Sequence, residues 1–274
     1  MPAYPVEYDS SRRPPPALRE LIDLYQYRDL LGLLIVNSIR SRYKRSSLGL
    51  IWTLLGPLLM MGVMTFAFSS VFSGEAQNYP IYVLAGLLLW NFFAQTTVSA
   101  MNQLVWGSTL LKRVYVPRTV FAVAAVGAGL VNFLLALLPL AGLMIVLGHP
   151  VRVAILFVPV ALLVAAMFVL GASLFLSSLS VFFTDLIPLY QVILQAWFYL
   201  TPIVYPKTIL PERFVWFMNL NPMHNLLELF RVPLYLGTLP GPNTLAAAIV
   251  SAVLALGLGW WIFAEKADEI SFRI

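Results

Sequence analysis

Long apolar runs separated by short polar segments dominate the chain. Six of the runs approach or exceed the roughly 20 residues with which an α-helix crosses about 30 Å of hydrocarbon. They are continuous rather than alternating, which argues against a transmembrane barrel. The predicted spans are Gly49–Phe72, Ile81–Val105, Val120–Leu147, Val153–Phe183, Leu186–Tyr205 and Thr244–Ala264. The pattern therefore predicts an all-α integral membrane protein, whose overlong fourth span is tilted or extends into the cytoplasm.

A mixed segment precedes the first span. From Leu18 to about Val36, apolar residues recur near helical spacing with charged residues between them. This spacing predicts an amphipathic helix lying in the membrane interface. The alternative is a helix packed on a neighbouring cytoplasmic surface. We expect residues 1–17 to be a flexible cytoplasmic tail, 18–47 the N-terminal helix with its basic junction, 48–264 the membrane domain, and 265–274 a second cytoplasmic tail.

The region between the fifth and sixth spans, residues 206–242, has a different pattern. Its apolar pieces, Phe214–Leu220 and Leu226–Leu236, are too short to cross a membrane and are interrupted by prolines. We expect a re-entrant helical hairpin on the outer side, which is tolerated at membrane depth only inside protein or a water-filled cavity. A plain extracellular loop is the alternative.

Basic residues are distributed unevenly between the two predicted faces, and this asymmetry sets the orientation. One face carries a cluster before the first span, a second cluster after the second span, and two residues near the C-terminus. That distribution places both termini in the cytoplasm. The basic residues expected on the cytoplasmic face are Arg40, Arg42, Lys44, Arg45, Lys112, Arg113, Arg118, Lys266 and Arg273, against Arg152, Lys207, Arg213 and Arg231 outside.

Composition narrows the possible functions. The chain has 60% hydrophobic and 11% charged residues and a mean hydropathy of +0.85, whereas soluble domains carry roughly 25% charged residues. Its net charge of +5 forms no basic patch with interleaved aromatics, so we expect no nucleic-acid partner. With no cysteine, no histidine pair at ligand spacing and no nucleophile–base pair, we predict neither a metal site nor catalytic residues.

The spans contain uncharged polar and aromatic side chains that suit the passage of a sugar polymer. Amides and hydroxyls recur about one helical turn apart in the second span, and an amide pair and three adjacent rings occur in the fifth. The alternatives are hydrogen bonding between helices for the polar groups and core packing for the rings. The candidate path residues are Asn91, Gln95, Ser99, Asn102, Gln191, Gln195, Trp197, Phe198 and Tyr199.

The last span has small residues at every fourth position. These are Ala247, Ser251, Ala255 and Gly259. Small residues at this spacing let two helices approach closely in a membrane. We interpret them as a packing face rather than as part of a functional site.

Five blocks of the chain together resemble the permease subunits of type-2 ABC exporters that move polysaccharides or lipid-linked glycans, such as O-antigen, teichoic acid, capsule or galactan. RSRYKRSSLGLIWTLLGPLL is similar to the family's first crossing and LLKRVYVPR to its first cytoplasmic loop. VFFTDLIPLYQVILQAWFYLTPIVYP resembles its fifth span, and NLNPMHNLLELFRVPLYLG its outer re-entrant region. The basic-then-apolar N-terminal helix is the fifth block.

The resemblance implies a homodimer in the bacterial cytoplasmic membrane, with two ABC nucleotide-binding subunits beneath it. The chain has no G-x-x-x-x-G-K-[ST] phosphate loop, so it is expected to bind no cofactor, and ATP and Mg²⁺ belong to the partner subunits. The implied contacts to the ATPase are Leu110, Leu111, Lys112, Arg113, Arg118 and Asp185. Arg40, Arg42, Lys44 and Arg45 would meet the headgroup of the lipid-linked glycan beside a gate formed by the N-terminal helix.

Three other functions compete with this interpretation. The nearest is a type-2 ABC exporter of a small hydrophobic drug or lipid, which would share the overall architecture. An integral-membrane lipid-modifying enzyme would need a clustered acid, base or metal site, and the sequence shows none. An uncoupled channel would need a charged ring or a filter-like loop, and neither is visible.

Overall fold

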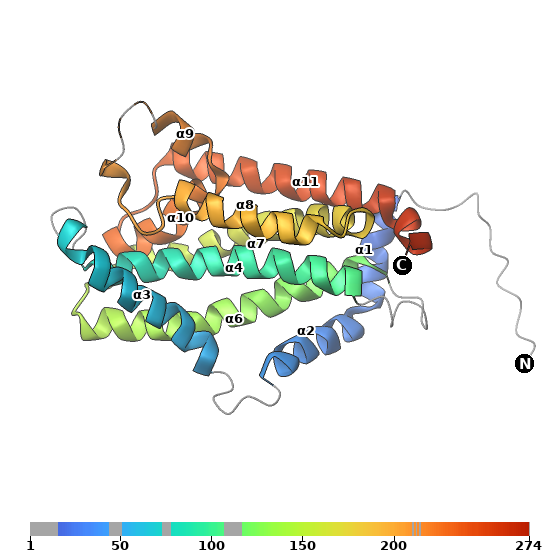
Figure 1. Cartoon of the computed structure of the whole chain (residues 1–274), viewed down its shortest axis with the longest axis horizontal. Coiled ribbons are helices and arrows are strands. Elements are labelled where there is room, and N and C mark those ends of the chain that lie inside the picture. Colours follow the sequence, from blue (N-terminus) through green and yellow to red (C-terminus); the bar gives the residue numbers. More distant parts are fainter. Residues whose placement is uncertain are drawn as a thin grey trace, which may run out of the picture.

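The computed structural model describes residues 16–43, 51–72, 78–106, 117–209, 211, 213 and 215–273. Within these ranges the chain forms helices and turns, without strands (Figure 1). Five helices are long and apolar enough to cross a membrane. They are α3 (Ile51–Phe72), α4 (Tyr79–Trp106), α6 (Thr119–Val146), α7 (Val158–Phe182, preceded by a 3₁₀ turn at Val153–Phe157) and α11 (Pro242–Arg273). The all-helical membrane fold is confirmed, and these five agree with the predicted first, second, third, fourth and sixth spans.

Helix α4 lies at the centre of the molecule, with α6 on one side and α8 and α11 on the other (Figure 1). In its apolar segment 78% of the residues are buried, whereas the corresponding segment of α3 has none. Ile81, Leu84, Leu89 and Met101 of α4 are among the most deeply buried side chains of the protein. Because α4 is enclosed on most sides, any polar residue on it must face a neighbour or a cavity.

Helices α7 and α11 pack backbone to backbone. A Cβ added to Gly171 would overlap the backbone of Ala255, and one added to Gly259 would overlap the carbonyl of Gly171. Ala248 and Ala252 are fully buried on the same face of α11. The predicted small-residue packing face is therefore confirmed. Towards the start of α11 it is formed by Ala248 and Ala252 rather than by the predicted Ala247 and Ser251.

The predicted fifth span is longer than the helix that forms. Helix α8 (Leu186–Leu200) has 15 residues, or about 22 Å at 1.5 Å per residue, which is less than the hydrocarbon thickness. The helix ends because Thr201 adopts an extended conformation, with φ −106° and ψ 133°, as residues before proline tend to do. The extension of this span to Tyr205 was wrong, and residues 201–205 form turns instead.

The region after α8 contains two short helices, α9 (Val215–Leu220) and α10 (Pro222–Arg231), and a π-helical turn at Val232–Leu236. Helix α10 packs against α4, α7 and α11, and most of its side chains are buried. Asn221 caps it, with its side chain accepting a hydrogen bond from the Met223 amide. Helices thus form at both apolar pieces predicted here, and α10 lies inside the protein rather than in an open loop.

The N-terminal segment forms two helices rather than one, α1 (Pro16–Gln26) and α2 (Arg28–Tyr43). One face, including Leu24, Leu30 and Leu34, packs on one end of the long helices. The opposite face leaves Tyr25 and Leu33 exposed. The packed face agrees with the alternative of a helix lying on a neighbouring surface, and the interfacial position of the exposed face stays a prediction.

The first and last helices are also joined by a hydrogen bond. The indole of Trp260 donates to the carbonyl of Ala17 over 3.1 Å. Helix α11 continues to Arg273, so residues 265–273 extend the last helix. Residues 1–15 of the predicted N-terminal tail lie outside the described residues.

Candidate functional site

A cavity of about 1320 Å³ opens beside α4, between α2, α3, α6 and α8. The amide and hydroxyl residues that recur along α4 all line it: Asn91, Gln95, Ser99 and Asn102. Their one-turn spacing places them on the single face of α4 that the other helices leave uncovered. The predicted polar stripe therefore lies in one continuous cavity wall.

Helix α8 supplies the facing wall. Gln195, Phe198 and Tyr199 line the same cavity. Gln191 lies in an adjoining hollow of about 520 Å³, which shares Gln95, Ser99, Asn102 and Gln195 with the larger cavity. The structure thus brings eight of the nine candidate path residues together.

Trp197, the ninth candidate, points into the protein. Its ring packs edge-on against Trp90 and Phe93, at centroid distances of 6.2 and 5.3 Å. Its N–H donates to the side-chain oxygen of Asn221 over 3.0 Å, and the Asn221 amide donates to the hydroxyl of Thr201 over 3.0 Å. These contacts anchor the end of α8 to the start of α10, and they favour the packing interpretation for Trp197.

Two amides on the cavity side of α4 donate hydrogen bonds within their own helix. Asn102 donates to the carbonyl of Val98 over 2.9 Å, and Gln103 donates to the hydroxyl of Ser99 over 3.0 Å. A polar contact between helices is instead made by the buried hydroxyls of Thr97 and Tyr190, 2.9 Å apart. The polar stripe of α4 therefore faces the cavity, whereas the bond between Thr97 and Tyr190 lies outside the cavity lining.

Sequence reasoning missed part of the lining. Asn37, Ser38 and Ser41 of α2 and Asn132 of α6 also face the cavity. The sequence could have pointed to Asn132, because it is the only amide in the third apolar run. The α2 residues had none, since polar residues are ordinary in an interfacial helix.

The proposed headgroup and coupling residues are only partly described. Arg40 lies exposed on α2, one turn from the lining residue Asn37. The side chain of Arg42 and all of Lys44 and Arg45 lie outside the described residues, as do Leu110, Leu111, Lys112 and Arg113 of the predicted coupling loop. Asp185 is exposed just before α8.

Arg118 is the last residue of the predicted coupling loop and immediately precedes α6. The next residue, Thr119, is buried and donates a hydrogen bond of 2.7 Å to the carboxylate of Glu20 in α1. Burial raises the pKa of Glu20, and this hydrogen bond and the charge of Arg118 oppose the rise. The end of the loop is therefore joined directly to the N-terminal helix.

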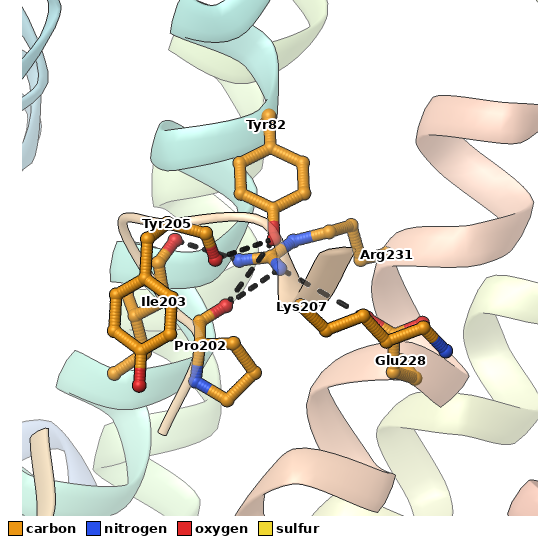
Figure 2. A network of polar contacts seen from close by, with 7 residues as sticks. All are labelled: Tyr82, Pro202, Ile203, Tyr205, Lys207, Glu228 and Arg231. Atoms are coloured by element: carbon orange, nitrogen blue, oxygen red, sulfur yellow. Dashed lines mark hydrogen bonds and ion pairs between the residues drawn. The ribbon is translucent and has the colours of Figure 1, made fainter. Parts of the chain in front are cut away.

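A second feature missed by the sequence is the burial of Arg231, which was predicted to be one of the basic residues of the outer face. Its side chain is only 2% exposed. It donates to the carbonyls of Pro202 and Ile203 at 2.9 Å each, and its guanidinium lies 3.8 Å from the centroid of the Tyr82 ring (Figure 2). Glu228, at 4.0 Å, pairs with it. Arg231 thus fastens the turns after α8 to α10 and α4.

Comparison with known proteins assigns the chain to a family. The family model described as "ABC-2 type transporter" matches residues 29–235. The chain belongs to the ABC-2 type transporter family. The matched region includes α2, α3, α4, α6, α7, α8 and α10, and so every helix that lines the cavity.

Relatives with similar sequences are named O-antigen export system permease proteins. One from Myxococcus xanthus is 31% identical over 264 residues, covering 94% of this chain and 100% of the relative. One from Klebsiella pneumoniae is 27% identical over 212 residues, covering 77% of this chain and 82% of the relative. The similarity to these proteins therefore extends over most of both chains.

Proposed function

We propose that this chain is the permease subunit of an ATP-driven ABC exporter that moves a polysaccharide or lipid-linked glycan across the bacterial cytoplasmic membrane. The observation that carries the proposal is the cavity beside α4, whose walls combine amides, hydroxyls and aromatic rings. Sugars present hydroxyls and apolar ring faces, which bind to such groups through hydrogen bonds and stacking. The relatives named as O-antigen export permeases support the same assignment.

The transporter is proposed to contain two copies of this chain and two ABC nucleotide-binding subunits. No helix among the described residues covers one side of the cavity, and α8 exposes Leu189, Val192 and Ile193 beside it. A second copy related by a two-fold axis would enclose a channel between two identical walls. ATP and Mg²⁺ would be held by the partner subunits.

The topology belongs to the same proposal. We place α3, α4, α6, α7, α8 and α11 across the membrane, with both termini in the cytoplasm. Helices α9 and α10 would form the re-entrant hairpin on the outer side. The short α8 is compatible with a span because the turns at residues 201–205 are enclosed by α10 and α4, which satisfies their backbone groups.

In the proposed cycle, closure of the ATPase dimer moves the cytoplasmic loop that ends at Arg118. The hydrogen bond between Thr119 and Glu20 transmits this movement to α1, which contacts α2, and α2 lines the cavity at its proposed cytoplasmic entrance. The diphosphate of the lipid-linked glycan would meet Arg40 and its neighbours. The glycan would then advance between α4 and α8 on contacts weak enough to release it.

The test is to fill the cavity. Ser99→Trp places a large ring between α4 and α8, whereas Leu138→Trp adds the same ring on the exposed side of α6. With the ATPase co-expressed, we expect Ser99→Trp to abolish surface glycan without preventing co-purification of the two subunits. Leu138→Trp should export normally. Normal export by Ser99→Trp would refute the path, and ATP-dependent export of a hydrophobic drug or lipid without glycan would favour the rival exporter.

A further inference from the structure

The four long walls of the cavity contain no charged residue. Helices α3, α4, α6 and α8 have no Asp, Glu, Lys or Arg anywhere in their sequences. Among the described residues that line the cavity, every polar one is an amide, a hydroxyl or an indole. A second copy would contribute the same neutral set, because a two-fold axis repeats the same surface.

These groups differ in what they can bind. An amide offers donors and an acceptor, so it pairs with a sugar hydroxyl in either direction, whereas a carboxylate or phosphate accepts only. The faces of aromatic rings such as Phe198 and Tyr199 carry the negative part of the ring quadrupole, which disfavours anions above them. The lining therefore suits hydroxyls and provides no countercharge for an acid.

Cationic side chains occur near the ends of the helices instead, and three of them lie at the proposed cytoplasmic end. Arg40 is exposed on α2 near the entrance, Arg118 precedes α6, and Lys266 of α11 lies 4.5 Å from the Phe182 ring. These cations can bind a single anionic group at the end of a substrate, such as a lipid diphosphate. The polymer attached to that group must then pass between neutral walls.

We propose that the glycan carried through this cavity has an uncharged repeat unit, and that polyanionic glycans are excluded by its neutral lining. This inference rests on the proposed function. An acidic repeat brings a new charge into the cavity with every unit that advances. Each charge loses hydration without gaining a countercharge, which corresponds to at least about tenfold in rate.

The experiment uses the permease reconstituted with its ATPase in proteoliposomes and one polyprenyl-diphosphate-linked hexose polymer in two forms. One form is neutral, and in the other the C6 alcohols are oxidised to carboxylates, so that chain length and linkage are matched. Protection from an added glycosidase measures ATP-dependent transport. We expect the acidic form to move at least about tenfold more slowly.

Two variants at one position separate charge from general damage. Gln195→Lys should raise the ratio of acidic to neutral transport, and Gln195→Glu, of similar size, should lower it. Equal transport of the two forms by the wild-type complex, or no opposite change of the ratio in the variants, overturns the neutral-repeat inference and leaves the proposed function standing. Failure of an ATP-hydrolysing complex to move either form overturns the proposed function, and this inference with it.

Discussion

Removing the buried guanidinium of Arg231 should destabilise the protein more than any exposed arginine would. Arg231→Ala leaves the carbonyls of Pro202 and Ile203 without their donor, whereas the partly exposed Glu228 carboxylate keeps Lys207 as a partner at 4.0 Å. Each hydrogen bond to a charged group contributes about 1.5–3 kcal/mol. We expect the loss of both bonds to lower the free energy of unfolding by about 3–5 kcal/mol.

The measurement is chemical or thermal unfolding of the purified permease in detergent. Arg152→Ala is the matched control, because Arg152 is exposed and donates one hydrogen bond of 3.0 Å, to the Leu236 carbonyl. An exposed interaction of this kind contributes about 0–1 kcal/mol. Arg231→Lys keeps the charge but cannot bond both carbonyls with a planar fork, so it should be intermediate.

Gly86→Ala tests the same contact from α4. A Cβ at this position would overlap the Arg231 guanidinium, so the methyl group should displace the arginine and reproduce much of its loss. If Arg231→Ala is no less stable than Arg152→Ala, the guanidinium does not hold the turns after α8, and the reasoning from Figure 2 is wrong.

Three further predictions concern other contacts. Thr119→Val should lower the amount of glycan exported per ATP hydrolysed severalfold, because it removes the hydrogen bond to Glu20. Glu20→Gln can still accept the threonine hydrogen bond and should retain most of the coupling. An unchanged ratio of export to hydrolysis in Thr119→Val would contradict the proposed transmission. Gly171→Ala should force α7 and α11 apart and lower the free energy of unfolding. Gly142→Ala, whose Cβ meets no neighbouring atom, should leave that free energy unchanged or raise it slightly. Equal effects of the two variants on stability would refute the close packing. Burial lowers the pKa of His224 from 6.5 to about 4, although the nearby Glu228 carboxylate acts to raise it. Stability should therefore fall as the pH drops from 7 to 5, by about 2 kcal/mol, and a His224→Gln variant that loses just as much would refute this cause.

The predictable part of the fold followed from hydrocarbon-length apolar runs. Five of the six predicted spans match long helices, because roughly 20 continuous apolar residues have few alternatives to a membrane helix. The fifth span was predicted too long because the apolar pattern continues through Tyr205, whereas Pro202 and the residue before it end the helix. Here local backbone geometry outweighed hydropathy.

The candidate site was predictable as a stripe and not as a cavity. The one-turn spacing of Asn91, Gln95, Ser99 and Asn102 defines a helix face from the sequence alone. The contribution of α2 and the inward direction of Trp197 depend on how helices far apart in the chain pack, which no local pattern contains. The burial of Arg231 was not predicted for the same reason, since a lone arginine beside a proline resembles an ordinary loop residue.

The hydrogen bond between Trp260 and Ala17 has a consequence for how the protein is made. The two residues are 243 positions apart, so α1 leaves the ribosome first but has no docking surface on α11 until synthesis is almost complete. The walls of the cavity can assemble in chain order, whereas this contact can form only at the end. A nascent or C-terminally truncated chain would therefore hold α1 through Thr119 and α6 alone, without its second attachment to α11.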